Sequence, residues 1–134
     1  MANAKFKSDS IIIYGKSLGT GIAAYVASFY PAKKLILETP YYSIPSLFSS
    51  WLPIYPHQRS SIYKLPTNDY LQKVTTPITI FHGTNDWIIP YRNAAKLKPI
   101  LKKEDKFITI KGGNHQNLFA YDLYQKKLDS LLKL

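Results

Sequence analysis

The sequence predicts a single α/β domain over residues 1–134, a three-layer sandwich in which helices flank a parallel sheet of about four strands. Two observations predict this fold. Four short apolar runs, rich in β-branched residues, are typical of strands that are covered on both faces. Helix-like segments separate these runs, and this alternation implies parallel strands joined by right-handed crossovers. The length of 134 residues, with 46% apolar and 19% charged residues, fits one ordered domain.

The elements follow one another regularly along most of the chain. The predicted strands lie at 11–14, 35–37, 78–81 and 107–110. The predicted helices lie at 18–30, 91–103 and 117–134. The first helix is rich in small residues and stops before Pro31, the second follows Pro90, and the third carries leucines at a helical period.

Residues 39–66 interrupt this alternation. The segment holds five prolines and several aromatic residues, so it is too proline-rich for one long helix. It predicts an excursion of short helices and turns outside the sheet. Two interpretations stay open: a packed surface loop, or a cap-like or lid-like wall of an aromatic pocket.

The composition excludes several classes of protein. There is no cysteine, which excludes disulfides, zinc–thiolate sites and cysteine nucleophiles and fits a cytoplasmic location. No apolar run approaches the ~18–20 residues of a membrane span. The net charge of +10 comes mainly from lysines spread along the chain. Nucleic-acid binders more often use clustered arginines with aromatics, so we expect a solvated surface and no nucleic-acid partner.

The most informative motif is GKSLG at residues 15–19, between a predicted strand and a predicted helix. A serine nucleophile has to project from a tight strand-to-helix turn, and side chains two residues before and after it are expected to collide. The motif therefore predicts Ser17 as nucleophile, with Gly15 and Gly19 making room. The backbone N–H of Leu18 would face a developing oxyanion. A phosphate loop is the competing interpretation, but there the Lys-Ser pair follows the second glycine instead of preceding it.

A serine nucleophile needs a base, and the base needs an orienting carboxylate. His115 lies in a glycine turn directly after the last predicted strand. Asp86 lies in a turn after the third predicted strand. Residues at the carboxyl ends of parallel strands share one edge of a sheet, so these two are the predicted base and acid.

Other candidates have more ordinary explanations. Glu38, at the end of the second strand, is the alternative acid. His82 is expected to be a packed, hydrogen-bonded structural residue, and His57 a surface residue. Asp69 is expected to cap a short segment over 70–74.

Taken together, the pieces resemble the C-terminal half of an α/β hydrolase, nearest to the serine aminopeptidase-like and monoacylglycerol lipase-like branch. The matching stretches are IIIYGKSLGTG at 11–21, LETP at 37–40, PITIFHGTND at 77–86 and GGNH at 112–115. The resemblance implies that the four strands are the family's fifth to eighth. It also implies that Ser17, Asp86 and His115 take the family's nucleophile, acid and base positions, with Leu18 as one oxyanion donor.

The chain departs from the family at its start, because only sixteen residues precede Ser17. The family's second oxyanion donor comes from a loop after its third strand, which has no counterpart here. Loss of one such donor lowers a rate by on the order of 10²–10³. The first strand would also be an open apolar edge, through which the chain could associate with another chain. We therefore expect it to be part of a longer protein.

The predicted function is a serine hydrolase that cleaves a small-molecule ester, thioester or amide through an acyl-enzyme, without a metal or cofactor. Tyr41 and Trp51 from the aromatic excursion, and Trp87 beside the acid, are predicted to bind the substrate. The first alternative is an inert fragment or interaction module that keeps the nucleophile turn without a complete site. The second is a basic module that binds nucleic acid or a membrane surface, which rests on the charge alone.

Overall fold

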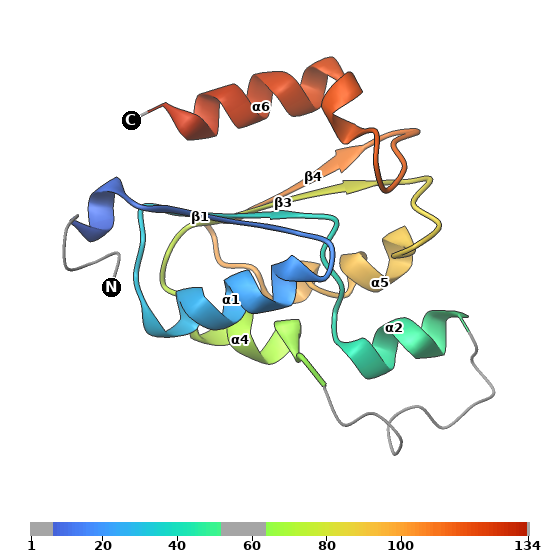
Figure 1. Ribbon diagram of the computed structural model, residues 1–134, viewed down its shortest axis with the longest axis horizontal. Coiled ribbons are helices and arrows are strands. Elements are labelled where there is room, and N and C mark those ends of the chain that lie inside the picture. Colours follow the sequence, from blue (N-terminus) through green and yellow to red (C-terminus); the bar gives the residue numbers. More distant parts are fainter. Residues whose placement is uncertain (1–6, 52–63, 134) are drawn as a thin grey trace.

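The sheet has four parallel strands in the order β1-β2-β3-β4 (Figure 1). The computed structural model describes residues 7–51 and 64–133. The strands are β1 (Ile12–Lys16), β2 (Lys34–Glu38), β3 (Ile78–Gly83) and β4 (Lys106–Ile110). All four predicted strands and their parallel pairing are confirmed. Because the strands run in one direction, their carboxyl ends lie along one edge of the sheet. Asp86 and His115 were predicted to lie at this edge.

Helices cover both faces of this sheet, which confirms the three-layer architecture. Figure 1 shows α6 on one side of the sheet and α1, α4 and α5 on the other. The described helices are α1 (Gly19–Phe29), α2 (Ile44–Trp51), α4 (Thr67–Lys73), α5 (Tyr91–Ala95) and α6 (Asp122–Leu132), with short 3₁₀ turns η2 (Ser8–Ser10), η3 (Lys98–Ile100) and η4 (Leu118–Ala120).

Two buried clusters follow from the alternation of side chains along the strands. Leu35 and Leu37 of β2 pack with the small residues of α1 on one face of the sheet. Ile36, between them, packs with Tyr124 of α6 on the other face. Since both faces are covered, every position of the central strand β3 is buried. This double burial is the reason why the strands are near-continuous in hydrophobicity.

Some predicted helix boundaries were wrong. The predicted helix over 91–103 is divided into α5 and η3, and Pro99 lies in η3. A proline removes a backbone donor and clashes with the preceding turn, so a continuous helix is disfavoured there. The predicted helix over 117–134 is likewise divided into η4 and α6, because Tyr121 between them is extended. Asp69 does not cap a helix at 70–74, because α4 already begins at Thr67 and Asp69 lies in its first turn.

The excursion over 39–66 begins as a packed segment. Tyr41 and Leu47 form a third buried cluster with Ile89, against which Ile44 and Leu65 pack. The helix α2 lies in this excursion, below the sheet in Figure 1. Residues 52–63, and His57 with them, lie outside the described residues, so the cap-like role of the excursion stays a prediction.

The β1 side of the sheet leaves apolar surface open to solvent. Within residues 7–51 and 64–133, β1 pairs only with β2. Ile22, Tyr25 and Phe29 of the neighbouring helix α1 are 55%, 46% and 65% exposed. Spaced by three and four residues, these side chains form a stripe on one helix face. In the described part of the chain, every helix is too short or too polar to cross a lipid bilayer.

Candidate active site

Ser17 occupies a strained turn between β1 and α1. Its φ of 54° lies in the left-handed region, which residues other than glycine rarely adopt. The surrounding backbone holds this conformation: the Ser17 N–H donates to the Glu38 carbonyl at 2.9 Å, and the Thr20 N–H and hydroxyl donate to the Ser17 carbonyl at 3.0 and 2.6 Å. Such strain at a defined position is typical of a nucleophile turn.

Only one of the two predicted glycine requirements is confirmed. A Cβ on Gly15 would lie 2.7 Å from Ala23 Cβ and 2.8 Å from the Gly19 carbonyl oxygen, so β1 and α1 approach each other only because residue 15 is glycine. The expectation for Gly19 was wrong, because a Cβ there would meet no atom within 4 Å. A requirement that sequence reasoning missed is at Gly21, where a Cβ would lie 2.2 Å from the Tyr41 hydroxyl.

Leu18 and Tyr41 meet behind the turn. The Tyr41 hydroxyl donates to the Leu18 carbonyl oxygen at 3.0 Å, and the Tyr41 side chain is fully buried. Burial raises the pKa of Tyr41 to about 12, so its hydroxyl remains a donor at neutral pH. Tyr41 therefore lies in the core beneath the turn and does not face an open pocket. The backbone N–H of Leu18 lies directly before α1, where the positive end of the helix dipole is located.

The two carboxylate oxygens of Asp86 have different hydrogen-bond partners. Its Oδ1 accepts hydrogen bonds from the backbone N–H groups of Ile88 at 2.9 Å and Ile89 at 2.8 Å. Its Oδ2 lies 2.9 Å from Nδ1 of His115. The Asp86 side chain is completely shielded from solvent, and that of His115 is 15% exposed. The first oxygen anchors the loop, and the second is left to orient the imidazole.

The imidazole of His115 joins the acid to the serine. Its Nε2 lies 2.9 Å from Ser17 Oγ, and its Nδ1 faces Asp86 Oδ2. The tautomer of His115 with its proton on Nδ1 satisfies both contacts, since Nδ1 then donates to the Asp86 carboxylate and Nε2 accepts from the serine hydroxyl. The structure thus brings Ser17, Asp86 and His115 together across 98 residues of sequence.

The loops that hold Asp86 and His115 are hydrogen-bonded to each other. The Asn85 N–H donates to the Gly113 carbonyl at 2.9 Å, and the Gly112 N–H donates to Thr84 Oγ1 at 2.8 Å. Gly83 allows this approach, because a Cβ there would lie 2.1 Å from the Gly113 carbonyl oxygen. These contacts set the separation of Asp86 and His115 independently of their own hydrogen bond.

His82 lies behind the acid, a position that sequence reasoning missed. It is fully buried, as expected for a packed structural residue. Its Nε2 lies 2.7 Å from the Ile89 carbonyl oxygen and 3.4 Å from Asp86 Oδ2, so Nε2 carries the proton. Burial lowers the pKa of His82, which keeps the imidazole neutral. Its Nδ1 has no hydrogen-bond partner among the described residues.

Glu38, the alternative acid, faces elsewhere. Its carboxylate accepts hydrogen bonds from the hydroxyls of Tyr14 and Tyr124, the latter at 3.0 Å, and lies 3.6 Å from Nζ of Lys16. Burial, together with Glu38, raises the pKa values of both tyrosines. Glu38 therefore connects β1 and β2 to α6 on the far side of the sheet, and Asp86 is the carboxylate that reaches His115.

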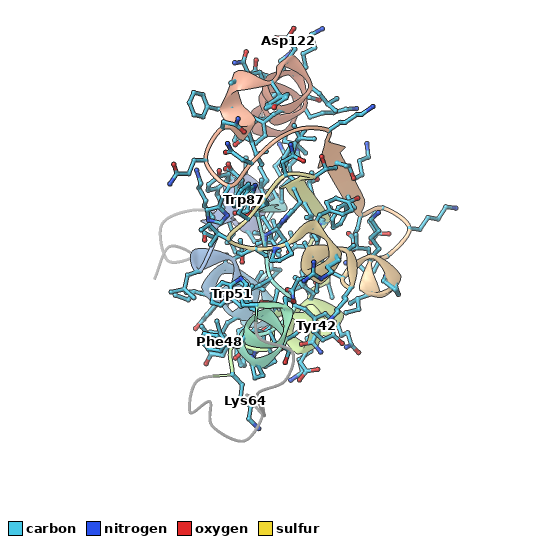
Figure 2. The ribbon with its side chains drawn as sticks, turned by 90° about the vertical axis from the view of Figure 1, so that its right-hand side faces the viewer. Tyr42, Phe48, Trp51, Lys64, Trp87 and Asp122 are labelled. Carbon is cyan, nitrogen blue, oxygen red and sulfur yellow. The ribbon has the colours of Figure 1, made fainter. Side chains whose placement is uncertain are left out.

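The two predicted tryptophans differ in their surroundings. Trp87 is 87% exposed and lines a hollow of about 350 Å³ together with Ile88, Asn114, His115 and Gln116. Trp51, at the end of α2, is 44% exposed, and its Nε1–H donates to the Ile88 carbonyl at 2.8 Å. Figure 2 shows Trp87 above Trp51 at the same end of the molecule. Among the described residues, no group of three or more His, Asp or Glu side chains is arranged so that it could hold a metal ion.

Similarity to solved structures supports the fold. An acylaminoacyl peptidase from Pyrococcus horikoshii matches with a TM-score of 0.70 and 16% identity over 96% of this chain and 25% of that one. Acetyl xylan esterase 1 from Thermoanaerobacterium matches with a TM-score of 0.70 and 16% identity over 96% of this chain and 48% of that one. Both neighbours are hydrolases by name.

Sequence similarity identifies the family. Alpha/beta hydrolase domain-containing protein 17C of Xenopus tropicalis is 27% identical over 92% of this chain and 39% of its own length. The chain thus spans about two fifths of the length of this curated relative. Residues 1–119 match the phospholipase/carboxylesterase family. The expected superfamily is confirmed: the chain belongs to the phospholipase/carboxylesterase family of α/β hydrolases.

Proposed function

We propose that this chain carries the nucleophile, base and acid of a serine hydrolase that cleaves an ester, thioester or amide. One observation carries the proposal: His115 lies 2.9 Å from Ser17 Oγ through Nε2 and 2.9 Å from Asp86 through Nδ1. Nucleophile, base and orienting acid need this order of contacts. The esterase and the peptidase among the structural neighbours favour ester or amide substrates.

In the proposed reaction, Ser17 Oγ attacks the carbonyl carbon while His115 Nε2 takes the hydroxyl proton. Asp86 holds the imidazole in the required tautomer and stabilises the imidazolium that forms. The carbonyl carbon then loses its leaving group, which takes the proton from His115. Water, activated by the same base, hydrolyses the acyl-enzyme.

The backbone N–H of Leu18 supports the negative charge that develops on the carbonyl oxygen. It lies next to Ser17 at the start of α1, so the amide and the helix dipole act at the same point. A second donor of this kind is not assigned to a described residue. Where one of two donors is missing, the rate falls by on the order of 10²–10³.

The test is covalent labelling with a fluorophosphonate, which reacts with an activated serine. Wild-type protein should be labelled at Ser17, and Ser17→Ala should not. Ser28→Ala is the control: the Ser28 hydroxyl donates to the Tyr25 carbonyl, one turn earlier in α1, at 2.6 Å, so labelling should persist. Equal labelling of Ser17→Ala and wild type would remove Ser17 as nucleophile.

A second candidate function is an interaction module without catalytic activity. The observations that favour it are the exposed apolar stripe of Ile22, Tyr25 and Phe29 on α1 and the strand β1, which pairs only with β2 in the described chain. An open strand edge and an exposed apolar stripe each offer a surface for another polypeptide. Hydrolysis of a simple acetate ester well above the Ser17→Ala background would exclude this alternative.

A further inference from the structure

The conformation of the loop places the Trp87 side chain in solvent. The residues on either side of the exposed pair Trp87 and Ile88 are Asp86 and Ile89, and both are buried. Asp86 Oδ1 holds the N–H groups of Ile88 and Ile89, which closes the loop tightly under the indole. With 87% of its surface open, Trp87 has the largest exposed fraction among the described large hydrophobic side chains. Packing against the described residues does not account for a large apolar ring in such a place.

The ring lies at the edge of the hollow that opens beside the imidazole. Trp87 and Ile88 come from the loop of the acid, and Asn114 and Gln116 come from the loop of the base. The second loop is also held firmly, because Asn114 Oδ1 accepts the N–H groups of Gln116 and Asn117 at 2.8 and 3.0 Å. Two anchored loops therefore form a hollow of about 350 Å³ with one large aromatic wall.

The position of this hollow relative to His115 assigns it to one half of a substrate. The serine proton that His115 Nε2 accepts is passed on to the atom that leaves. The leaving group therefore has to lie on the imidazole side of the reacting carbonyl, whereas the carbonyl oxygen lies toward the N–H of Leu18. The hollow includes His115 in its lining, so it continues from the position of the departing atom.

We propose that this hollow is the leaving-group subsite and that Trp87 selects apolar, preferably aromatic, leaving groups there; this inference rests on the proposed function. In the step concerned, the bond between Ser17 Oγ and the carbonyl carbon forms and the bond from that carbon to the leaving oxygen breaks. The serine proton passes through His115 to that oxygen, and a neutral alcohol departs. An aromatic group on the alcohol stacks on the indole before and during this step.

Trp87 is expected to affect acylation of Ser17 and to leave deacylation unchanged. Once the alcohol has left, no part of the remaining acyl group occupies the hollow. Removal of the indole should therefore lower kcat/KM for esters of aromatic alcohols and leave the hydrolysis of a given acyl-enzyme unchanged. A tryptophan that only stabilised the loop would affect both steps and all leaving groups.

The experiment compares benzyl acetate with ethyl acetate, which give the same acetyl-enzyme. For Trp87→Ala we expect kcat/KM for benzyl acetate to fall by about tenfold, the effect of one aromatic contact, with little change for ethyl acetate. Trp87→Phe, which keeps an aromatic face, should restore most of the preference. Tyr30→Ala is the matched control, since Tyr30 is 55% exposed at the end of α1 and absent from the lining of the hollow.

The outcomes separate the two proposals. Equal losses for both esters with Trp87→Ala, or no loss for either, would overturn the leaving-group assignment while an inactive Ser17→Ala still supports the serine mechanism. If Ser17→Ala hydrolyses both esters as fast as wild type, or wild type hydrolyses neither and takes no fluorophosphonate label, the proposed function fails and the subsite assignment fails with it.

Discussion

Nε2 of His82 lies 3.4 Å from Oδ2 of Asp86, the same oxygen that faces Nδ1 of His115 at 2.9 Å. His82 also donates to the Ile89 carbonyl, in the residue whose N–H is held by Asp86 Oδ1. Asp86 thus contacts the neutral imidazole of His82 and also Ile89, to which His82 donates a hydrogen bond. This arrangement makes His82 a positioning residue for Asp86.

Replacement of His82 should make the Asp86 side chain less firmly positioned. His82→Leu leaves the buried Ile89 carbonyl without its side-chain donor, which should lower the free energy of unfolding by about 1–3 kcal/mol. His82→Gln places an amide N–H in a similar position and should restore most of this loss. The measurement is urea denaturation, together with the downfield NMR resonance of the His115 Nδ1 proton. An unchanged resonance in His82→Leu would show that His82 fills space without positioning Asp86.

The stability of the protein should depend on pH through His82. Burial lowers the pKa of this imidazole below the ordinary value of 6.5, so in mildly acidic solution the unfolded chain is protonated where the folded chain is neutral. The unfolded state then binds more protons, and stability falls as the pH is lowered below about 6.5. Denaturation of His82→Gln from about pH 7 to about pH 5 should show a smaller loss than wild type. Parallel curves for the two proteins would contradict the expectation.

Asp86→Asn should lower ester turnover and leave the stability of the fold nearly unchanged. The amide oxygen can still accept the N–H groups of Ile88 and Ile89, so we expect little change in stability. The amide nitrogen would then face Nδ1 of His115 and favour the wrong tautomer. Ester turnover should fall by on the order of 10³–10⁴. Asp69→Asn, at an exposed position in the first turn of α4, is the matched control and should keep full turnover; a similar fall in both variants would argue against a role specific to Asp86.

The two glycines of the turn around Ser17, Gly15 and Gly19, should respond differently to alanine. Gly15→Ala introduces a Cβ 2.7 Å from Ala23 Cβ, which should destabilise the protein by about 1–3 kcal/mol. Gly19→Ala introduces a Cβ into open space at the start of α1, so it should be neutral or stabilising by up to about 1 kcal/mol. Chemical denaturation of both variants measures this difference. If Gly19→Ala proved as destabilising as Gly15→Ala, the turn would be tighter than its geometry indicates.

The sequence by itself determined the order and type of the main elements, because a doubly covered parallel strand must be apolar at nearly every position, as at 78–81. It also placed Ser17, Asp86 and His115 in turns after the first, third and fourth strands, since parallel strands bring their carboxyl ends to one edge. Local patterns of a few residues suffice for these features.

Only the tertiary structure decided which carboxylate reaches His115. Glu38 is the last residue of β2 and Asp86 follows β3, and the choice depends on the direction in which each side chain points and on the contact between Asn85 and Gly113. The burial of Tyr41 beneath Leu18 and the place of His82 behind Asp86 were also decided there. Such contacts join residues far apart along the chain, and their geometry depends on the packing of both partners, which no local pattern encodes.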